Sequence, residues 1–142
     1  MIKNLATTSI IMFQILIGRA SYYDNDKLIG MLKDYFKTNQ NAPQIIGHSF
    51  YGNDKKMVFQ MEIQTQTKNV NKDLIFSFNT ISKITQLAKT NFTHSVLVIH
   101  FTKDFLPIIA ESSLKCNKKF FIDKVYDENQ WRKHCLTIKN YN

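Results

Sequence analysis

Glycine, proline and cysteine are scarce in this chain of 142 residues, with four, two and two copies respectively. So little glycine and proline argues against a collagen-like, low-complexity or loop-rich chain, and the sequence has no repeat of the solenoid type. Several enzyme motifs are also missing: there is no Gly-rich phosphate loop, no nucleophile elbow and no zinc-protease helix. With no Cys-x-x-Cys or His-x-x-x-His spacing either, the sequence predicts no metal site and no cofactor.

The residues that are present are typical of a globular protein with an excess of positive charge. Apolar residues make up 44% of the chain and aromatic residues 13%, which is enough for one domain with a substantial core. The formal net charge of +8 permits binding to nucleic acid, anionic lipid or an acidic partner. The excess is scattered lysine, however, so a solvated surface is the simpler explanation.

Residues 1–20 have the organisation of a secretory signal peptide. One lysine precedes an uncharged apolar run at 5–17, and Gly18 and Ala20 supply small residues for a cleavage after Ala20. The run is shorter than the roughly 20 residues of a spanning helix, which argues against a permanent membrane span. Arg19 is atypical before a cleavage site, so an uncleaved anchor and a buried first helix of a cytoplasmic domain stay open. We expect a signal peptide or N-terminal apolar helix at 1–20 and a single domain at 21–142.

The most continuously apolar run after these residues is 95–101, which we take as the core strand of a sheet. It is short and rich in β-branched side chains, and this pattern favours a strand covered on both faces. A helix at 72–89 precedes it, with Asn71 as the expected N-cap and one apolar stripe. A further amphipathic helix is expected at 25–38. Strands at 44–51 and 57–66 form a hairpin, and the alternation of the second predicts a half-buried antiparallel strand.

The last third of the chain gives weaker signals. We predict a strand at 108–114, a turn at 116–119, a short strand at 120–122 and a helix at 128–138. Asp127 and Gln130 have the spacing of a capping box, and Trp131, Cys135 and Ile138 would face inward. The order of elements predicts an α+β fold of two layers. Four to five mostly antiparallel strands would carry the helices on one face, in the order α-β-β-α-β-β-(β)-α.

Cys116 and Cys135 are the only cysteines and can form one intramolecular disulfide if the chain is exported. The bond would join a turn at the sheet edge to the last helix. Closing a loop of about 18 residues would stabilise the fold by roughly 3 kcal/mol in the chain-entropy model. The alternative is two free thiols, with Cys135 as a small core residue.

Basic side chains gather at two predicted hairpin tips and on the last helix. The candidates for a polyanion-binding rim are Lys55, Lys56, Lys115, Lys118, Lys119, Arg132 and Lys133. If the two tips lie at one end of the sheet, these residues could contact phosphates. The simpler interpretation is that they keep the strand ends soluble.

Two weaker constellations involve titratable residues. His48 and His100 lie in predicted strands and could be neighbours across the sheet, where with Glu111 they could exchange protons. Asp54 and Glu62 weakly resemble the carboxylates of a metal-dependent nuclease, although Gln64 stands where that pattern has lysine. Both carboxylates are otherwise ordinary solvent-side residues.

The function expected from these features is a small exported or envelope-associated domain that binds another protein without catalysis. Its location would be secreted or periplasmic. The alternative is a cytoplasmic basic protein that binds nucleic acid or another polyanion, such as an anionic surface. A metal-dependent nuclease using Asp54 and Glu62 is the third hypothesis.

Overall fold

The computed structural model describes residues 22–53, 55–103 and 105–140. The predicted signal peptide at 1–20 therefore lies outside the described residues. Within these ranges no helix is long and apolar enough to cross a bilayer. The helices and strands are, in chain order, α2 (Asn25–Thr38), β1 (Gln44–Asn53), β2 (Lys56–Thr65), α3 (Val70–Ile84), β3 (His94–Phe101), β4 (Ile108–Ser113), α4 (Leu114–Phe121), α5 (Glu128–His134) and β5 (Thr137–Asn140).

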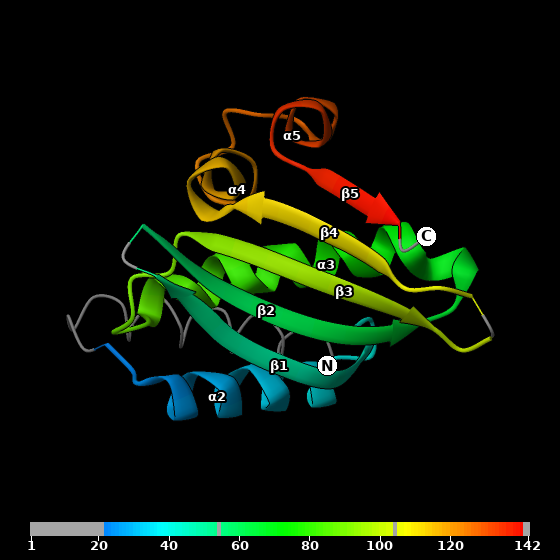
Figure 1. The fold of residues 1–142 in the computed structure, drawn as a ribbon, viewed down its shortest axis with the longest axis horizontal. Helices are drawn as coiled ribbons and strands as arrows, with labels where there is room; N and C mark the ends of the chain where they lie inside the picture. The colour runs from blue at the N-terminus through cyan, green and yellow to red at the C-terminus, as the bar shows by residue number, and fades with distance from the viewer. Residues whose placement is uncertain (1–21, 54, 104, 141–142) are drawn as a thin grey trace, which may run out of the picture.

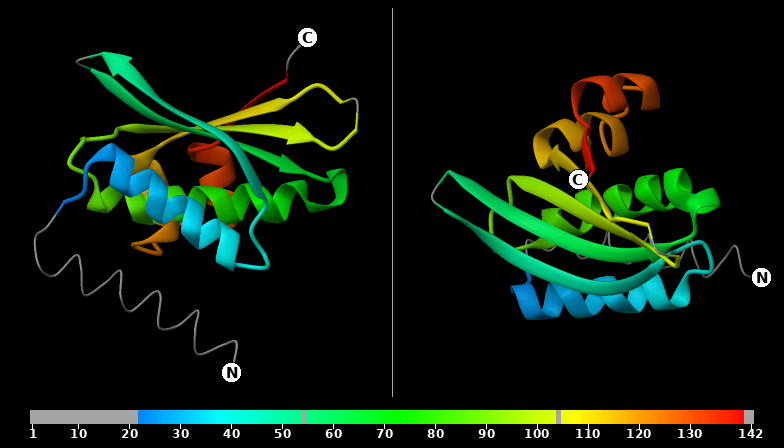
Figure 2. Two further views of the ribbon diagram at one scale, coloured as in Figure 1. Left: turned by 90° about the horizontal axis from the view of Figure 1, so that it is seen from below. Right: turned by 45° about the vertical axis from the view of Figure 1, so that its right-hand side comes forward.

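The five strands form one sheet in the order β1-β2-β3-β4-β5 (Figure 1). β2 and β3 run parallel because α3 crosses from the end of one to the start of the other, and the remaining pairs are antiparallel. The helices lie on one side of the sheet (Figure 2). The predicted two-layer α+β fold, with a mostly antiparallel sheet, is confirmed.

The core lies between α2, α3 and the inner face of the sheet. The side chains of Phe59, Met61 and Ile63 on β2 are fully buried there, as the alternation in the sequence predicted. Helix α2 has the predicted bounds, and the Asp24 side chain caps it by accepting a hydrogen bond from the Lys27 N–H at 2.9 Å. Helix α3 begins at Val70 after Asn69, so the predicted cap at Asn71 is wrong.

The structure overturns the predictions for residues 116–122. The predicted turn and short strand are instead helix α4, which begins after Ser113. The Ser113 side chain accepts a hydrogen bond from the Cys116 N–H at 3.1 Å and caps this helix. The helix was missed because the polar Asn117 interrupts its apolar side. Without a continuous helical stripe, the apolar pair Phe120 and Phe121 resembles a short strand.

The predicted helix at 128–138 is also too long. Helix α5 ends at His134, and Thr137–Asn140 forms the edge strand β5. Ile138 pairs with Ala110 of β4 and is half exposed, so its predicted place on the inward helix face is wrong. The β-branched pair Thr137-Ile138 suits a strand better than a helix.

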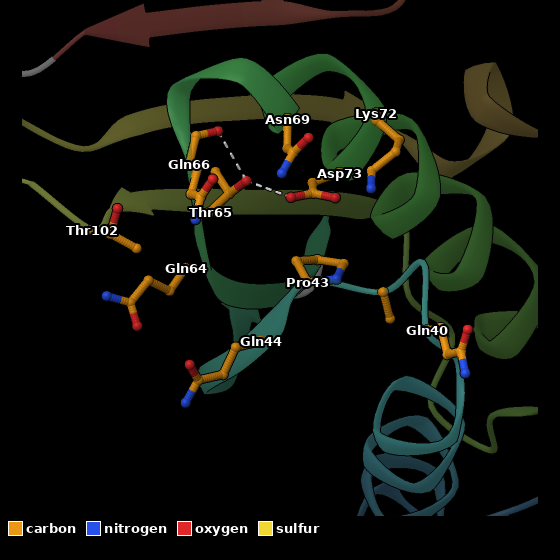
Figure 3. A pocket seen from close by; sticks show the side chains of 11 residues that line it. Gln40, Pro43, Gln44, Gln64, Thr65, Gln66, Asn69, Lys72, Asp73 and Thr102 are labelled. Carbon is orange, nitrogen blue, oxygen red and sulfur yellow. Dashed lines mark hydrogen bonds between the residues drawn. The ribbon is translucent and has the colours of Figure 1, made fainter.

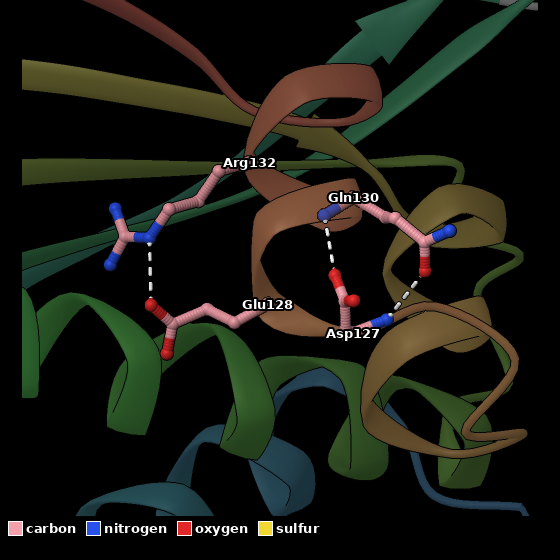
Figure 4. Close-up of polar contacts among 4 residues, drawn as sticks. All are labelled: Asp127, Glu128, Gln130 and Arg132. Carbon is pink, nitrogen blue, oxygen red and sulfur yellow. Dashed lines mark hydrogen bonds and ion pairs between the residues drawn. The ribbon is translucent and has the colours of Figure 1, made fainter.

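The start of α5 is as predicted. The Asp127 carboxylate accepts from the Gln130 N–H at 2.8 Å, and the Gln130 side-chain oxygen accepts from the Asp127 N–H at 2.9 Å (Figure 4). This capping box fixes the direction of the helix. Trp131, in the first turn, is fully buried and packs edge-on against Phe78 of α3.

A buried polar network ties α4 and α5 to the sheet. The Asn117 side-chain oxygen accepts from the Trp131 indole N–H at 2.8 Å and from the Ser112 hydroxyl. Its amide nitrogen donates to the Ser95 hydroxyl at 3.1 Å, and Ser95 donates to the Ser112 carbonyl at 2.8 Å. All four residues are buried. The network therefore satisfies polar atoms that would otherwise be costly inside the core.

Candidate functional site

The outer face of the sheet, opposite the helices, is covered by no element of the described residues (Figure 2). We call it the open face. Its side chains, placed by strand register, include the partly or largely exposed Tyr51, Gln60, Glu62, Val98, His100, Ile109, Glu111 and Lys139, and the buried Val58 and Val96. The prediction that the core strand is covered on both faces is wrong for its second half, because Val98 and His100 of β3 are only partly buried on this side, whereas Val96 is buried.

A histidine–carboxylate pair lies on the open face. The His100 Nε2 atom is 2.9 Å from the Glu62 Oε1 atom, and each side chain is about one-third exposed, at 35% and 34%. Gly47 on β1 pairs with Glu62, and a Cβ atom there would come within 2.6 Å of the Glu62 Oε2 atom. The absence of a side chain at Gly47 thus leaves room for the carboxylate.

The predicted proximity of His48 and His100 is wrong. His48 pairs with Met61 in register, so it lies on the same side of the sheet as the buried core, whereas His100 lies on the open face. Burial lowers the pKa of His48, Lys33 lowers it further, and Asp26 partly offsets both. His48 therefore faces groups of α2, and no acid–base pair of histidines forms.

Two further pairs of polar side chains lie on the open face. The Tyr51 hydroxyl donates to the Gln60 side-chain oxygen at 2.8 Å, and the Lys139 Nζ atom lies 3.3 Å from the Glu111 Oε2 atom. Burial raises the pKa of Tyr51, and the Glu111 charge raises it further. Val98 and Ile109 are cross-strand partners near the centre. The face is thus apolar in the middle, with mutually paired polar groups around it.

The basic residues of the predicted rim lie on three elements. Lys55 lies in the turn before β2 and Lys56 begins that strand, Lys115, Lys118 and Lys119 are on α4, and Arg132 and Lys133 are on α5. The hairpin tip and the start of α4 meet at one end of the sheet, because Thr93 receives the Leu114 N–H at 2.9 Å and donates its own N–H to the Met57 carbonyl at 2.9 Å. There, burial lowers the pKa of His94, Lys56 lowers it further, and Glu111 partly offsets both.

On α4 and α5, the cations Lys118, Lys119 and Arg132 have partners among the described residues. Lys118 lies 3.3 Å from Asp123, and Arg132 lies 3.1 Å from Glu128 one helical turn away (Figure 4). The Lys119 Nζ atom sits 5.3 Å from the centre of the Tyr126 ring. Since these contacts are mostly solvent-exposed, each is weak, but they reduce the unpaired positive charge of the helical pair.

The two nuclease candidates are not brought together by the described residues. Asp54 lies outside them, and Glu62 is bound to His100 on the open face. No cluster of three or more histidine, cysteine, aspartate or glutamate side chains that could hold a metal occurs in the described ranges.

Cys116 and Cys135 form a disulfide, with their Cα atoms 5.5 Å apart. Cys116 lies in the first turn of α4 and Cys135 directly follows α5. The bond therefore joins two helices to each other, and the prediction that it joins a helix to a turn of the sheet is wrong. A disulfide is compatible with an oxidising, extracellular location.

A polar pocket of about 280 Å³ opens where β2 leads into α3 (Figure 3). We call it the amide pocket, because five of its lining side chains are the amides Gln40, Gln44, Gln64, Gln66 and Asn69. The Thr65 hydroxyl donates to the Asp73 carboxylate at its floor, and Lys72 lies at its edge (Figure 3). Sequence reasoning missed this pocket, although glutamines on both sides of Thr65 were a visible signal.

Comparisons with protein-family models, with curated proteins and with solved structures found no match for this chain.

Proposed function

We propose that this chain is a small exported domain that binds another protein through the open face, without catalysis. The observation that carries the proposal is an extended sheet face that no described element covers. Soluble domains normally leave one face of an antiparallel sheet to water, and then the exposed side chains are mostly polar. Here Val98, Ile109 and Tyr51 interrupt the polar pattern, and a central apolar group with a polar rim is the usual anatomy of a protein interface.

The open face has a suitable size. Five strands span roughly 20 Å across the sheet, and the eight residues of β3 span roughly 25 Å along it. The projected area is therefore about 500 Å², and side chains add to the accessible surface. A standard interface buries about 800 Å² on each partner. A partner would need to cover most of the face and reach one of its edges.

The charges of the open face indicate the chemistry of the partner. Glu62 is paired with His100 and Glu111 with Lys139, so the face has no strong net charge to complement. A face without excess positive charge gives phosphate groups little to bind, which argues against a polyanion at this surface. The partner we expect is a protein surface with apolar side chains at its centre and hydrogen-bonding groups around them.

Site-specific photo-crosslinking in the native host tests this proposal. We expect a photoreactive residue at Gln60 or Val98 to give a discrete adduct, and one at Lys37 on the exposed side of α2 to give none. Adding Val98→Lys should abolish the adduct from Gln60 without lowering the urea midpoint, since Val98 is partly exposed. Adducts only from Lys37, or none from either face position, would contradict the proposal.

The export part of the proposal rests on the pattern of residues 1–20 and on the disulfide. Intact-mass measurement of protein from the native host tests both. We expect a chain that begins after Ala20 and lacks two hydrogens relative to the reduced protein. A chain that keeps Met1 and two free thiols would remove the extracytoplasmic assignment while leaving the binding face to be judged by the crosslinks.

The second candidate is polyanion binding at the basic end of the sheet, which is favoured by the meeting of the hairpin tip with α4. Lys56 and Lys115 would contribute to this surface together with Lys133 on α5. Retention on heparin that falls steeply with salt, and that weakens in a Lys115→Gln and Lys133→Gln double variant, would support it. Elution of the wild-type protein at low salt would exclude it.

A further inference from the structure

The amide pocket lies at a position where the topology favours ligand binding. Strand β2, helix α3 and strand β3 form a parallel β-α-β unit within the sheet. Ligands of such units bind beyond the carboxyl ends of the strands, where loops diverge and leave a crevice. The pocket is lined there by the ends of β2 and β3, and the loop between α2 and β1 supplies its other wall (Figure 3).

The floor of the pocket is a buried carboxylate. Asp73 is only 5% exposed and lies in the first turn of α3, where the helix dipole stabilises negative charge. The Thr65 hydroxyl, also buried, donates to one of its oxygens. The pair places an acceptor at the base of an otherwise amide-lined space.

The walls offer both donors and acceptors. None of the five lining amide side chains forms a hydrogen bond with another described residue. Each amide has an acceptor oxygen and a nitrogen with two donor hydrogens. A ligand hydroxyl also donates and accepts, so a molecule with several hydroxyls can match this set in many orientations. Only Ala42 and Pro43 add apolar surface, which disfavours an apolar ligand.

The pocket has no net charge that would select an ion. The Asp73 carboxylate at the floor and the Lys72 ammonium at the edge have opposite signs, so neither an anion nor a cation gains from their sum. The volume of about 280 Å³ corresponds to about nine water molecules at 30 Å³ each, so one sugar unit can enter and a longer chain would extend outward. We propose that the amide pocket binds a neutral saccharide.

Binding can be measured by NMR on the folded chain, with maltotriose and fully N-acetylated chitotriose as neutral probes. We expect saturable shifts of the backbone amide signals of Gln64, Gln66 and Thr102 with at least one of them. Loss of one or two hydrogen bonds in Gln64→Ala or Gln66→Ala should weaken that binding by about fivefold. Gln86→Ala, an exposed glutamine outside this pocket, should bind as the wild type does.

Three outcomes would overturn the assignment. The first is the absence of saturable shifts with both saccharides. The second is equal saccharide binding by the wild-type and Gln64→Ala, Gln66→Ala double-variant proteins. The third is a preference for glycylglycine or glucose 6-phosphate over both neutral probes, which would show that the charges at Asp73 and Lys72 determine the ligand.

Discussion

Replacing Asn117 by alanine should destabilise the protein by about 3–4 kcal/mol, although this side chain touches no proposed ligand. The change removes the hydrogen bonds to Trp131, Ser112 and Ser95. The Trp131 indole N–H would be left buried without an acceptor, which costs about 1–3 kcal/mol. The loss of the other two bonds adds about 1 kcal/mol each, and the Ser112 hydroxyl, already 3.4 Å from the Ser113 carbonyl, can recover part of this.

The assay is urea denaturation followed by fluorescence and by far-UV circular dichroism. Trp131 is the only tryptophan of the chain, so its fluorescence reports directly on the junction of α4, α5 and α3. Asn129→Ala is the matched control, because Asn129 is an exposed asparagine on α5 and its loss should change the unfolding free energy by less than about 0.5 kcal/mol.

A double-mutant cycle with Trp131→Phe isolates the central bond, with circular dichroism as the readout because the fluorophore is lost. We expect a coupling energy of at least about 1 kcal/mol between positions 117 and 131. The reasoning would be refuted if Asn117→Ala cost less than about 1 kcal/mol, or if the two changes were additive. If Asn117→Ala does not fold, Ser95→Ala tests the same network, because it removes one of the bonds to Asn117.

Three further predictions concern stability. Ser77→Ala on α3 should stabilise the protein by about 1 kcal/mol, because the buried Ser77 hydroxyl has no hydrogen-bond partner among the described residues and alanine is the better helix former; a loss of stability in urea would contradict this. Replacing Cys116 and Cys135 together by serine should lower the unfolding free energy by about 3 kcal/mol, and reductant should then have no further effect. The pKa of His94 is lowered on folding below its ordinary 6.5, so the unfolded chain binds more protons and stability should fall as the pH drops through 6.5. Urea midpoints at pH 8 and pH 5.5 measure this fall, which should be smaller in His94→Gln; an equal fall would exclude His94 as its cause.

The sequence predicted those elements whose apolar pattern has a single period. In α2 and β2 the side chains that face the core follow the helical and strand periods without interruption, and both elements have nearly the predicted bounds. The capping box at Asp127 was readable for a similar reason, since it depends on two residues three positions apart.

The sequence failed where a polar residue occupies a core position or where tertiary contacts decide. Asn117 on α4 faces the protein interior only because Trp131 and the serines of β3 and β4 satisfy the hydrogen bonds of its amide group. The glutamines beside Thr65 were visible in the sequence, but the place of the amide pocket was not, because the α2–β1 loop and the ends of β2 and β3 meet only through the sheet order. The disulfide was predictable as a pair, but the elements it joins were not, since Cys116 was assigned to a turn.

The four-residue strand β5 has a consequence for self-association. It is the last strand of the described residues and all four of its residues are exposed, so little apolar packing holds it against β4. When β5 separates, the backbone N–H and C=O groups of β4 become available to the same segment of a neighbouring molecule. Strand β5 thus shields the hydrogen-bonding edge of β4, and exchange of this strand between two molecules would give a swapped dimer.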